Sequence, residues 1–216
     1  MSRLFEEQAR RYNVYPIHNL NDTRRESEGR ARADFEKRGG KWRYSGAVSN
    51  MPPGLAPPVA SRGFTMTAKL DLPRAGLTGP IFAQGGQLGG IGFYLDRGRP
   101  VFILNTLKGE TAAVKAGEAL GPGVRQIELK VVRGPAAADG GSDYRVTISA
   151  DERVLAEETV HFALASYFGI PDTFDVGSDQ GSPVLAGYPS GTAFPARISD
   201  IAFDFAGSSP TEPPSH

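Results

Sequence analysis

The chain has 216 residues, of which 39% are hydrophobic, so it can bury one sizeable core and is expected to form one domain with arms. It has 27 glycines and 17 prolines, which favour short strands joined by turns, and no cysteine, which excludes disulfides, thiolate zinc sites and a cysteine nucleophile. The formal charge is zero, but residues 1–50 hold 11 Lys and Arg against 7 Asp and Glu, and these acidic residues interrupt the basic surface that a nucleic-acid partner would need.

The first segment, residues 1–18, is predicted to be a helical arm. Leu4, Phe5 and Tyr12 recur at a spacing that approximates one apolar stripe of a helix, and Pro16 ends the helix because proline lacks the N–H donor. A helix this short is marginal in water by itself. The stripe therefore needs another surface to pack on.

Residues 19–50 are dense in charges of both signs and poor in apolar side chains, which indicates a solvated connector. Trp42 and Tyr44 mark the return to packed structure near its end. The next stretch, residues 51–58, holds four prolines, so it is predicted to wrap an edge in an extended conformation. At the far end of the chain, residues 207–216 are polar and are predicted to form a disordered tail.

The region between, residues 51–206, is predicted to be a β-sandwich domain. Apolar and polar side chains alternate there with the period of a half-buried strand, and turn residues such as Asp96, Arg97 and Gly98 separate successive strands. No helix is predicted between strands, which disfavours βαβ units. The fold class is therefore all-β, an antiparallel two-sheet sandwich of jelly-roll or concanavalin-like type with a short N-terminal helix. The predicted strands cover residues 64–72, 91–95, 101–105, 124–132, 144–148, 154–156 and 198–205.

Three stretches carry a resemblance to a known family. They are LFEEQARRYNVYPIHN at 4–19, IFAQGGQLGGIGFYLDRGRPVFILN at 81–105, and DTFDVGSDQGSPV at 172–184, which FPARISDIAFD follows at 194–204. In order and spacing they resemble the C-terminal region of bacterial arylsulfatases of the sulfatase family, over nearly the whole chain.

The resemblance implies a non-catalytic C-terminal accessory domain of an arylsulfatase-type sulfuric ester hydrolase. Its partner would be a sulfatase catalytic domain, covalent or separate, on which the arm docks through Leu4, Phe5 and Tyr12. Catalysis in the family uses a formylglycine made from Cys or Ser in a Cys/Ser-x-Pro-x-Arg motif. The nearest pattern here, at residues 208–212, has Glu where that motif has Arg. No catalytic or cofactor-binding residue is carried over, so the chain is not expected to be an enzyme by itself.

Asp175, Gly177, Asp179 and Gly181 form an Asp-x-Gly-x-Asp-x-Gly run that supports two interpretations. Carboxylate oxygens on a tight loop can hold Ca²⁺, although the bidentate glutamate of an EF-hand loop is absent. Alternatively, the glycines supply positive φ and the aspartates bond the backbone of their own turn, which we favour. No resident metal or cofactor is therefore expected, and calcium at Asp175 and Asp179 is the alternative.

A free-standing, lectin-like carbohydrate-binding module is the alternative function, because sandwiches often bind sugars through aromatic and polar side chains. The sequence has one tryptophan and no aromatic cluster, so most aromatic residues are expected to belong to the core. The aromatic residues available to a glycan are Trp42, Tyr44, Tyr94, Tyr167 and Tyr188.

Two further features that can carry chemistry are set aside. No Ser/His/Asp arrangement can be assembled around His18, His161 or His216, so none of them is predicted to be catalytic. The glycine run GGQLGG at residues 85–90 precedes a strand and not the N-terminus of a helix, so it is not a phosphate-binding loop.

No apolar run approaches the roughly 20 residues that span a bilayer, and the first residues contain no apolar segment after their charges. Neither a membrane segment nor a signal peptide is therefore expected. The expected location is cytoplasmic by default, and periplasmic if the chain is part of an exported sulfatase.

Overall fold

The computed structural model describes residues 2–12, 26–27, 29–30, 33–34, 36–37, 41–60, 62–105, 111–162, 172–184 and 191–205. The tail predicted at 207–216 and the helix end predicted at Pro16 lie outside these residues. The chain divides into two units, Met1–Gly39 and Gly40–His216, and each is described by itself. Among the described residues, no helix has the length and hydropathy that a membrane crossing requires.

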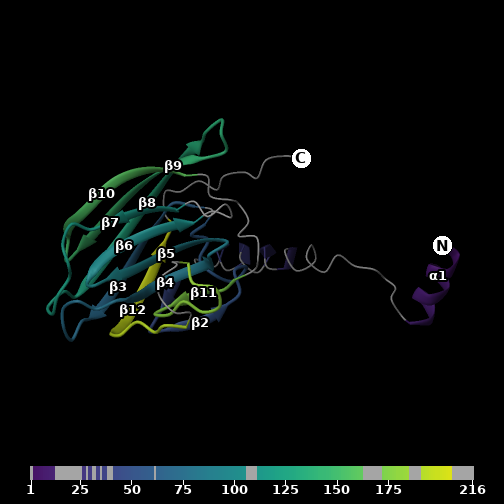
Figure 1. Cartoon of the computed structure of the whole chain (residues 1–216), viewed down its shortest axis with the longest axis horizontal. Coiled ribbons are helices and arrows are strands. Elements are labelled where there is room, and N and C mark those ends of the chain that lie inside the picture. Colours follow the sequence, from purple (N-terminus) through teal and green to yellow (C-terminus); the bar gives the residue numbers. More distant parts are fainter. Residues whose placement is uncertain are drawn as a thin grey trace. The chain divides into compact units, whose positions relative to one another are not determined.

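The first unit contains helix α1, Ser2–Arg11, so the short N-terminal helix is confirmed (Figure 1). Leu4 and Phe5 expose 61% and 53% of their surface, and Tyr12, directly after the helix, exposes 67%. The N–H of Tyr12 still donates to the Gln8 carbonyl at 2.9 Å, so the last turn continues to this residue. These three side chains of the arm are therefore mostly exposed.

The second unit begins with sheet A, whose strands are all antiparallel. Its central strand β3 alternates as the sequence predicts, with Phe64, Met66 and Ala68 buried and Lys69 exposed. In spatial order the strands are β1 (Trp42–Tyr44), β12 (Arg197–Asp204), β3 (Phe64–Asp71), β8 (Gln126–Ala136), β9 (Ser142–Ala150) and β10 (Arg153–Phe162).

Sheet B is also antiparallel and has six strands among the described residues. In spatial order they are β2 (Val48–Met51), β11 (Phe174–Val176), β4 (Gly79–Gly86), β5 (Gly89–Asp96), β6 (Arg99–Asn105) and β7 (Thr111–Lys115). Every residue of β4 is buried, in contrast to the alternation of β3. The centre of sheet B is therefore covered on both faces.

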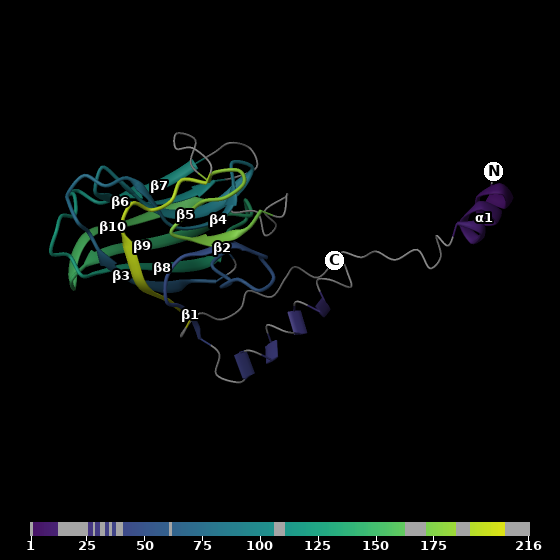
Figure 2. The same ribbon diagram turned by 90° about the horizontal axis from the view of Figure 1, so that it is seen from below.

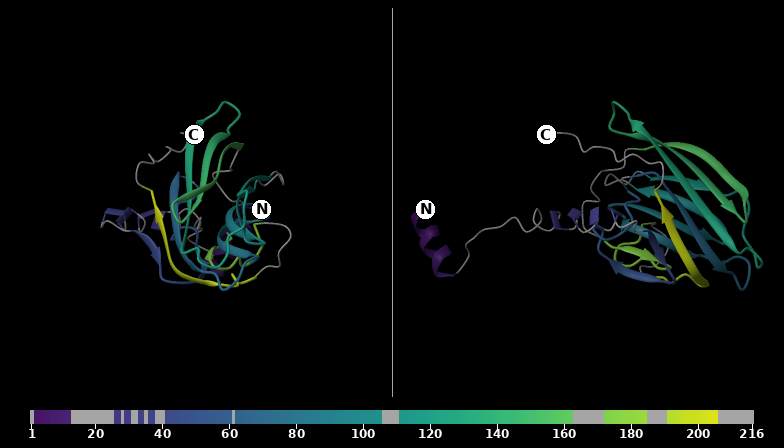
Figure 3. Two further views of the ribbon diagram at one scale, coloured as in Figure 1. Left: turned by 90° about the vertical axis from the view of Figure 1, so that its left-hand side faces the viewer. Right: turned by 180° about the vertical axis from the view of Figure 1, so that it is seen from behind.

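The two sheets pack face to face (Figures 2 and 3). A group of phenylalanines fills the space between them. The ring of Phe82 on β4 lies 6.2 Å from Phe64 of β3 and 5.3 Å from Phe203 of β12, measured between centroids. Phe174 of β11 lies 5.6 Å from the same Phe203 ring. Offset and edge-to-face aromatic pairs of this kind add to the stabilisation from burial. The all-β, antiparallel two-sheet sandwich is confirmed.

The sandwich starts earlier in the chain than residue 51. Strand β1 and the first three residues of β2 lie inside the range 19–50, and these strands pair with β12 and β11 because Trp42 and Val48 bring apolar side chains to the sheets. Residues 51–58 also differ from the expected edge wrap. The N–H of Leu55 donates to the Pro52 carbonyl in a turn, and Ala56 is fully buried in the core.

Candidate functional site

A loop covers the outer face of sheet B. Here the outer loop means residues 177–184, which follow β11. On the face of the sheet that points away from the main core, Ala83 of β4 and Ile103 of β6 form a second buried cluster with Val184 of this loop. Gly92 of β5 lies between them, and a Cβ built on it would meet Val184 at 3.5 Å. Small residues on β4 and β5 therefore let the loop lie close to the sheet.

Asp175 ties the outer loop to β2 and to its own strand. Its Oδ1 accepts from the backbone N–H of Asn50 at 2.7 Å, and its Oδ2 accepts from the Thr173 hydroxyl at 2.9 Å and the Gln180 N–H at 3.2 Å. The residue exposes 1% of its surface. Three donors thus compensate the desolvation of this carboxylate.

Asp179 and Asp172 hold the C-terminal half of the same loop. Asp179 exposes none of its surface, and its Oδ2 accepts from the Val184 N–H at 2.8 Å. Asp172 accepts from the Thr173 N–H at 2.8 Å through Oδ1 and from the Ser182 N–H at 3.2 Å through Oδ2. Gly177 and Gly181, both at φ 70°, allow the chain to turn between these anchors.

Asp175 and Asp179, the candidates for a calcium site, therefore come together in one loop. The bonds described above direct both oxygens of Asp175 and Oδ2 of Asp179 to N–H and O–H donors, which compete with a cation for the same lone pairs. No group of three His, Asp or Glu side chains with metal-binding geometry occurs in the part of the chain that the structure describes. Calcium binding stays a prediction to be tested.

Two buried amides at this site are not singled out by residue type or spacing alone. The Nδ2 of Asn105, at the end of β6, donates to the carbonyl of Val184, so Asn105 and Asp179 hold the two backbone groups of one residue. Gln84 on β4 is buried as well. Within the described residues, Asn105 Oδ1 and Gln84 Oε1 have no hydrogen-bond partner. Both residues belong to the family-like stretch 81–105, which is the signal that could have identified them.

The glycine run at residues 85–90 forms the end of β4, a two-residue tip and the start of β5. A Cβ on Gly86 would lie 2.5 Å from the Ser182 carbonyl oxygen and 2.8 Å from Asp172 Oδ2. At the tip, the N–H of Gln87 donates to Ser182 Oγ at 3.1 Å. Gly86 therefore makes room for the outer loop.

The described aromatic residues do not form an exposed platform. Trp42 packs edge-on against Phe205 at 5.3 Å, and Tyr44 packs against Phe174 at 6.0 Å between ring centroids. Burial raises the pKa of Tyr44 to about 12, and burial together with the nearby Asp96 raises the pKa of Tyr94 to about 12. Tyr167 and Tyr188 lie outside the described residues, as do His18 and His216.

The comparisons with known proteins find likeness in structure only. The sequence matches no family model and no curated protein. Among solved structures, the chain is similar to the CBM40 module of the Ruminococcus gnavus IT-sialidase bound to α2,3-sialyllactose, with 13% identity and a TM-score of 0.49, over 79% of this chain and 93% of that one. It is also similar to domains LG4-5 of the mouse laminin α1 chain, with 13% identity and a TM-score of 0.46, over 76% of this chain and 41% of that one. A likeness at this level carries no function to this chain.

Proposed function

We propose that this chain is a non-catalytic accessory domain of an arylsulfatase-type sulfuric ester hydrolase. The observation that supports it is the contact between two of the family-like stretches, residues 81–105 and 172–184. They are far apart in the sequence, yet Asn105 of the first bonds Val184 of the second, and position 86 has space only for glycine because the Ser182 carbonyl lies against it.

The hydrogen bonds of Asp175, Asp179 and Asn105 also support a structural function for the two family-like stretches. Asp175 and Asp179 accept hydrogen bonds from backbone N–H groups, and Asn105 donates to a backbone carbonyl. Each bond fixes the path of a loop on a sheet. This pattern of Asp, Asn and Gly thus serves to build the sandwich and requires no reacting group.

The exposed apolar side chains of the helical arm favour a protein partner for this chain. Leu4, Phe5 and Tyr12 are large apolar side chains that remain mostly exposed on α1 and directly after it. Exposed apolar groups that lie together mark interaction surfaces more often than single exposed residues do. The proposed occupant of this surface is the sulfatase catalytic domain.

The proposal is tested on the native assembly. The protein is tagged in the cells that encode it, purified and digested, and its peptides are identified by mass spectrometry. The expected result is a Cys/Ser-x-Pro-x-Arg peptide that carries formylglycine, from the same polypeptide or from a bound one. Absence of such a peptide from a purified assembly that contains this chain would overturn the proposal.

The chain alone should not hydrolyse an aryl sulfate, and turnover that survives repurification would contradict its non-catalytic role.

A second candidate is a lectin-like module that binds glycans. The observation that favours it is the tip between β4 and β5, where Leu88 is half exposed beside Gln87 and Ser182. Sugar sites combine apolar contact with a few polar groups of this kind. A glycan array with sulfated sugars and sialyllactose, with and without calcium, tests this candidate. Binding to none of them would reject it, and binding that Leu88→Ser removes would support it.

A further inference from the structure

Two carboxylates bracket the imidazole of His161. His161 lies near the end of β10, where its side chain points to the outer face of sheet A, while the next residue, Phe162, is buried. Its Nδ1 lies 2.8 Å from Asp143 Oδ1, and its Nε2 lies 2.9 Å from Asp139 Oδ2. Asp143 is the partner of His161 in the ladder between β9 and β10.

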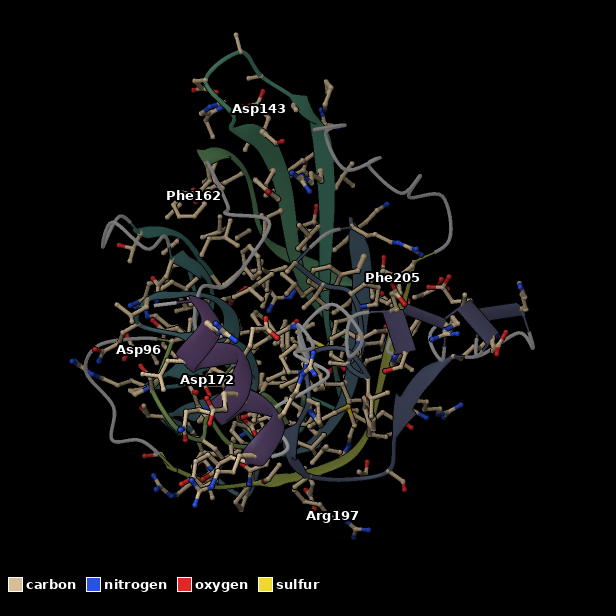
Figure 4. All side chains as sticks on the ribbon, turned by 90° about the vertical axis from the view of Figure 1, so that its right-hand side faces the viewer. Asp96, Asp143, Phe162, Asp172, Arg197 and Phe205 are labelled. Atoms are coloured by element: carbon tan, nitrogen blue, oxygen red, sulfur yellow. The ribbon has the colours of Figure 1, made fainter. Side chains whose placement is uncertain are left out.

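The third member of this group comes from a different element. Asp139 belongs to the connection between β8 and β9, which projects from the top of the sandwich in Figure 1, and Figure 4 shows Asp143 near that projection. The connection is closed by the Ala137 N–H, which donates to the Gly141 carbonyl at 2.7 Å. Asp139 Oδ1 accepts from the Gly141 N–H at 2.8 Å. Asp139 therefore links the tip of this hairpin to the end of β10.

The two hydrogen bonds to the ring determine the protonation state of His161. An ionised carboxylate only accepts hydrogen bonds, and a neutral imidazole donates from one nitrogen only, whereas an imidazolium donates from both. With Asp139 and Asp143 ionised, both bonds can exist together only when His161 is protonated. The two carboxylates meet different nitrogens of the ring, so they do not converge on a common metal ion.

We propose that Asp139, Asp143 and His161 form a proton-operated clasp, which holds the β8–β9 tip against β10 when His161 is protonated and releases the tip when it is neutral. A neutral ring keeps one carboxylate as its acceptor and turns a lone pair toward the other. Asp143 is fixed in the β9 ladder, so Asp139 and the tip are the part that moves.

The tip is shaped to this ring. A Cβ built on Gly141 would collide with Nε2 of His161, so only glycine leaves space for the imidazole at its observed position. A larger residue at 141 would displace the ring without changing any charge. A substitution at residue 141 therefore tests the geometry of the clasp, while the charge of the two nearby carboxylates stays the same.

The charged groups around His161 come from three elements. The tip contributes Asp139, and β9 contributes Asp143, followed on the same face by Arg145, whose ladder partner is Thr159. On β10 itself the outward side chain of Glu157 lies opposite Thr147. The hydrogen bonds to Asp143 and then Asp139 raise the pKa of His161 above its ordinary value of 6.5. The Gly141 N–H and then His161 lower the pKa of Asp139 below 3.8.

The direction of the pH response follows from these shifts. Because the pKa of His161 is raised in the folded state, the clasp is fully closed below about pH 6.5 and is lost as the pH rises through the folded value. Asp139 remains ionised over this whole window, since its pKa is lowered. The three side chains are about half or more exposed, so high salt weakens the response.

An NMR titration of the whole chain tests the clasp. The imidazole signal of His161 is identified by its loss in His161→Gln, and its midpoint is expected above 6.5. The amide signal of Gly141 should move with the same midpoint, because that N–H donates to Asp139. The variant Asp139→Asn with Asp143→Asn should return the His161 midpoint toward its ordinary value. Gly141→Ala should lower it as well, although both carboxylates remain.

Two variants serve as controls. Glu157→Gln removes a charge from the same face of β10, and Gly117→Ala adds a methyl group where no atom lies within 4 Å. Both should leave the His161 midpoint nearly unchanged. An ordinary midpoint in the native chain, a Gly141 amide that does not follow it, or a Gly141→Ala variant with the native midpoint would overturn the clasp. If a variant fails to fold, the two native signals decide alone.

Discussion

Single residues explain why the outer loop takes one path over sheet B. Asp175 and Asp179 are buried carboxylates that accept hydrogen bonds from backbone N–H groups, while Gly86 lacks the side chain that would lift the loop from the sheet. The sequence indicates an Asp and Gly turn at 175–181. It does not indicate Asn105 as the opposite anchor, because nothing local ties a strand end to a loop some eighty residues later.

We predict that Gly86→Ala destabilises the sandwich by about 1–3 kcal/mol, because the new methyl group meets the backbone of Ser182 and the carboxylate of Asp172. Gly117→Ala is the matched control, since the space at Gly117 is open. Urea unfolding followed by circular dichroism gives both free energies of unfolding. Equal stability of the two variants would mean that the outer loop moves aside without cost.

We also predict that Asp175→Ala destabilises the fold by about 2–4 kcal/mol, because it leaves the N–H groups of Asn50 and Gln180 and the Thr173 hydroxyl unpaired. Asp175→Asn keeps one acceptor and should cost less.

Thermal unfolding with calcium and with a chelator completes the experiment. The Tm of the native chain is expected to be the same in both, and a calcium-dependent rise that Asp175→Asn abolishes would establish the metal site instead.

At the scale of elements, the two-residue turns connect the strands that the sequence predicts best. Arg97 and Gly98 join β5 to β6 with φ of 50° and 84°, and Asp151 and Glu152 join β9 to β10 with φ of 44° and 65°. Positive φ at both central residues suits the right-handed twist of a hairpin. Asp151 also accepts from the Gln126 N–H at 2.9 Å, which ties this turn to β8.

Glu152→Gly should stabilise the protein by about 0.5–1 kcal/mol, because a residue with a Cβ is strained at positive φ and glycine is not. Glu157→Gly, in the middle of β10, should have the opposite sign, since glycine weakens a strand interior. Free energies of unfolding of both variants check the prediction. A loss of stability in Glu152→Gly would show that its side chain makes a contact worth more than the backbone strain.

The strands that the sequence does not predict are missed for physical reasons. β4 is buried along its whole length, because the core covers one face and the outer loop covers the other, so it has no alternation of polar and apolar residues. β1, β2 and β11 have three or four residues each, which is too short for a period to appear. The long strands with one solvated face, β3 and β9, follow the predicted pattern.

At the scale of the whole molecule, exposed ion pairs make the stability of the fold depend on pH in the acidic range. The Lys115 ammonium, 2.6 Å from Asp96, lowers the pKa of that carboxyl below 3.8, although partial burial opposes it. The Arg43 guanidinium, 2.7 Å from Asp200, does the same and links β1 to β12. Lowered carboxyl pKa values stabilise the fold above about pH 4, and this contribution is lost as the pH falls through the folded values.

We predict that Asp96→Asn with Asp200→Asn flattens the loss of stability between about pH 4 and pH 2, because two of the carboxyls that take up protons on unfolding are gone. The effect should be small, since both pairs are at the surface, and it should shrink further in about 1 M salt. Urea unfolding across this pH range measures it. An unchanged slope would show that neither pair acts in solution.

The class of fold can be predicted from the sequence, since alternation along β3 and β9 and the turns at Gly98 and Asp151 are properties of neighbouring residues. Which polar groups meet depends on the tertiary fold. Asn105 and Val184 are 79 positions apart, and His161 lies 18 and 22 positions from its two aspartates. Such contacts depend on strand order and register, which bring distant residues together and which no local pattern encodes. The outer loop and the clasp therefore became visible only in the folded chain.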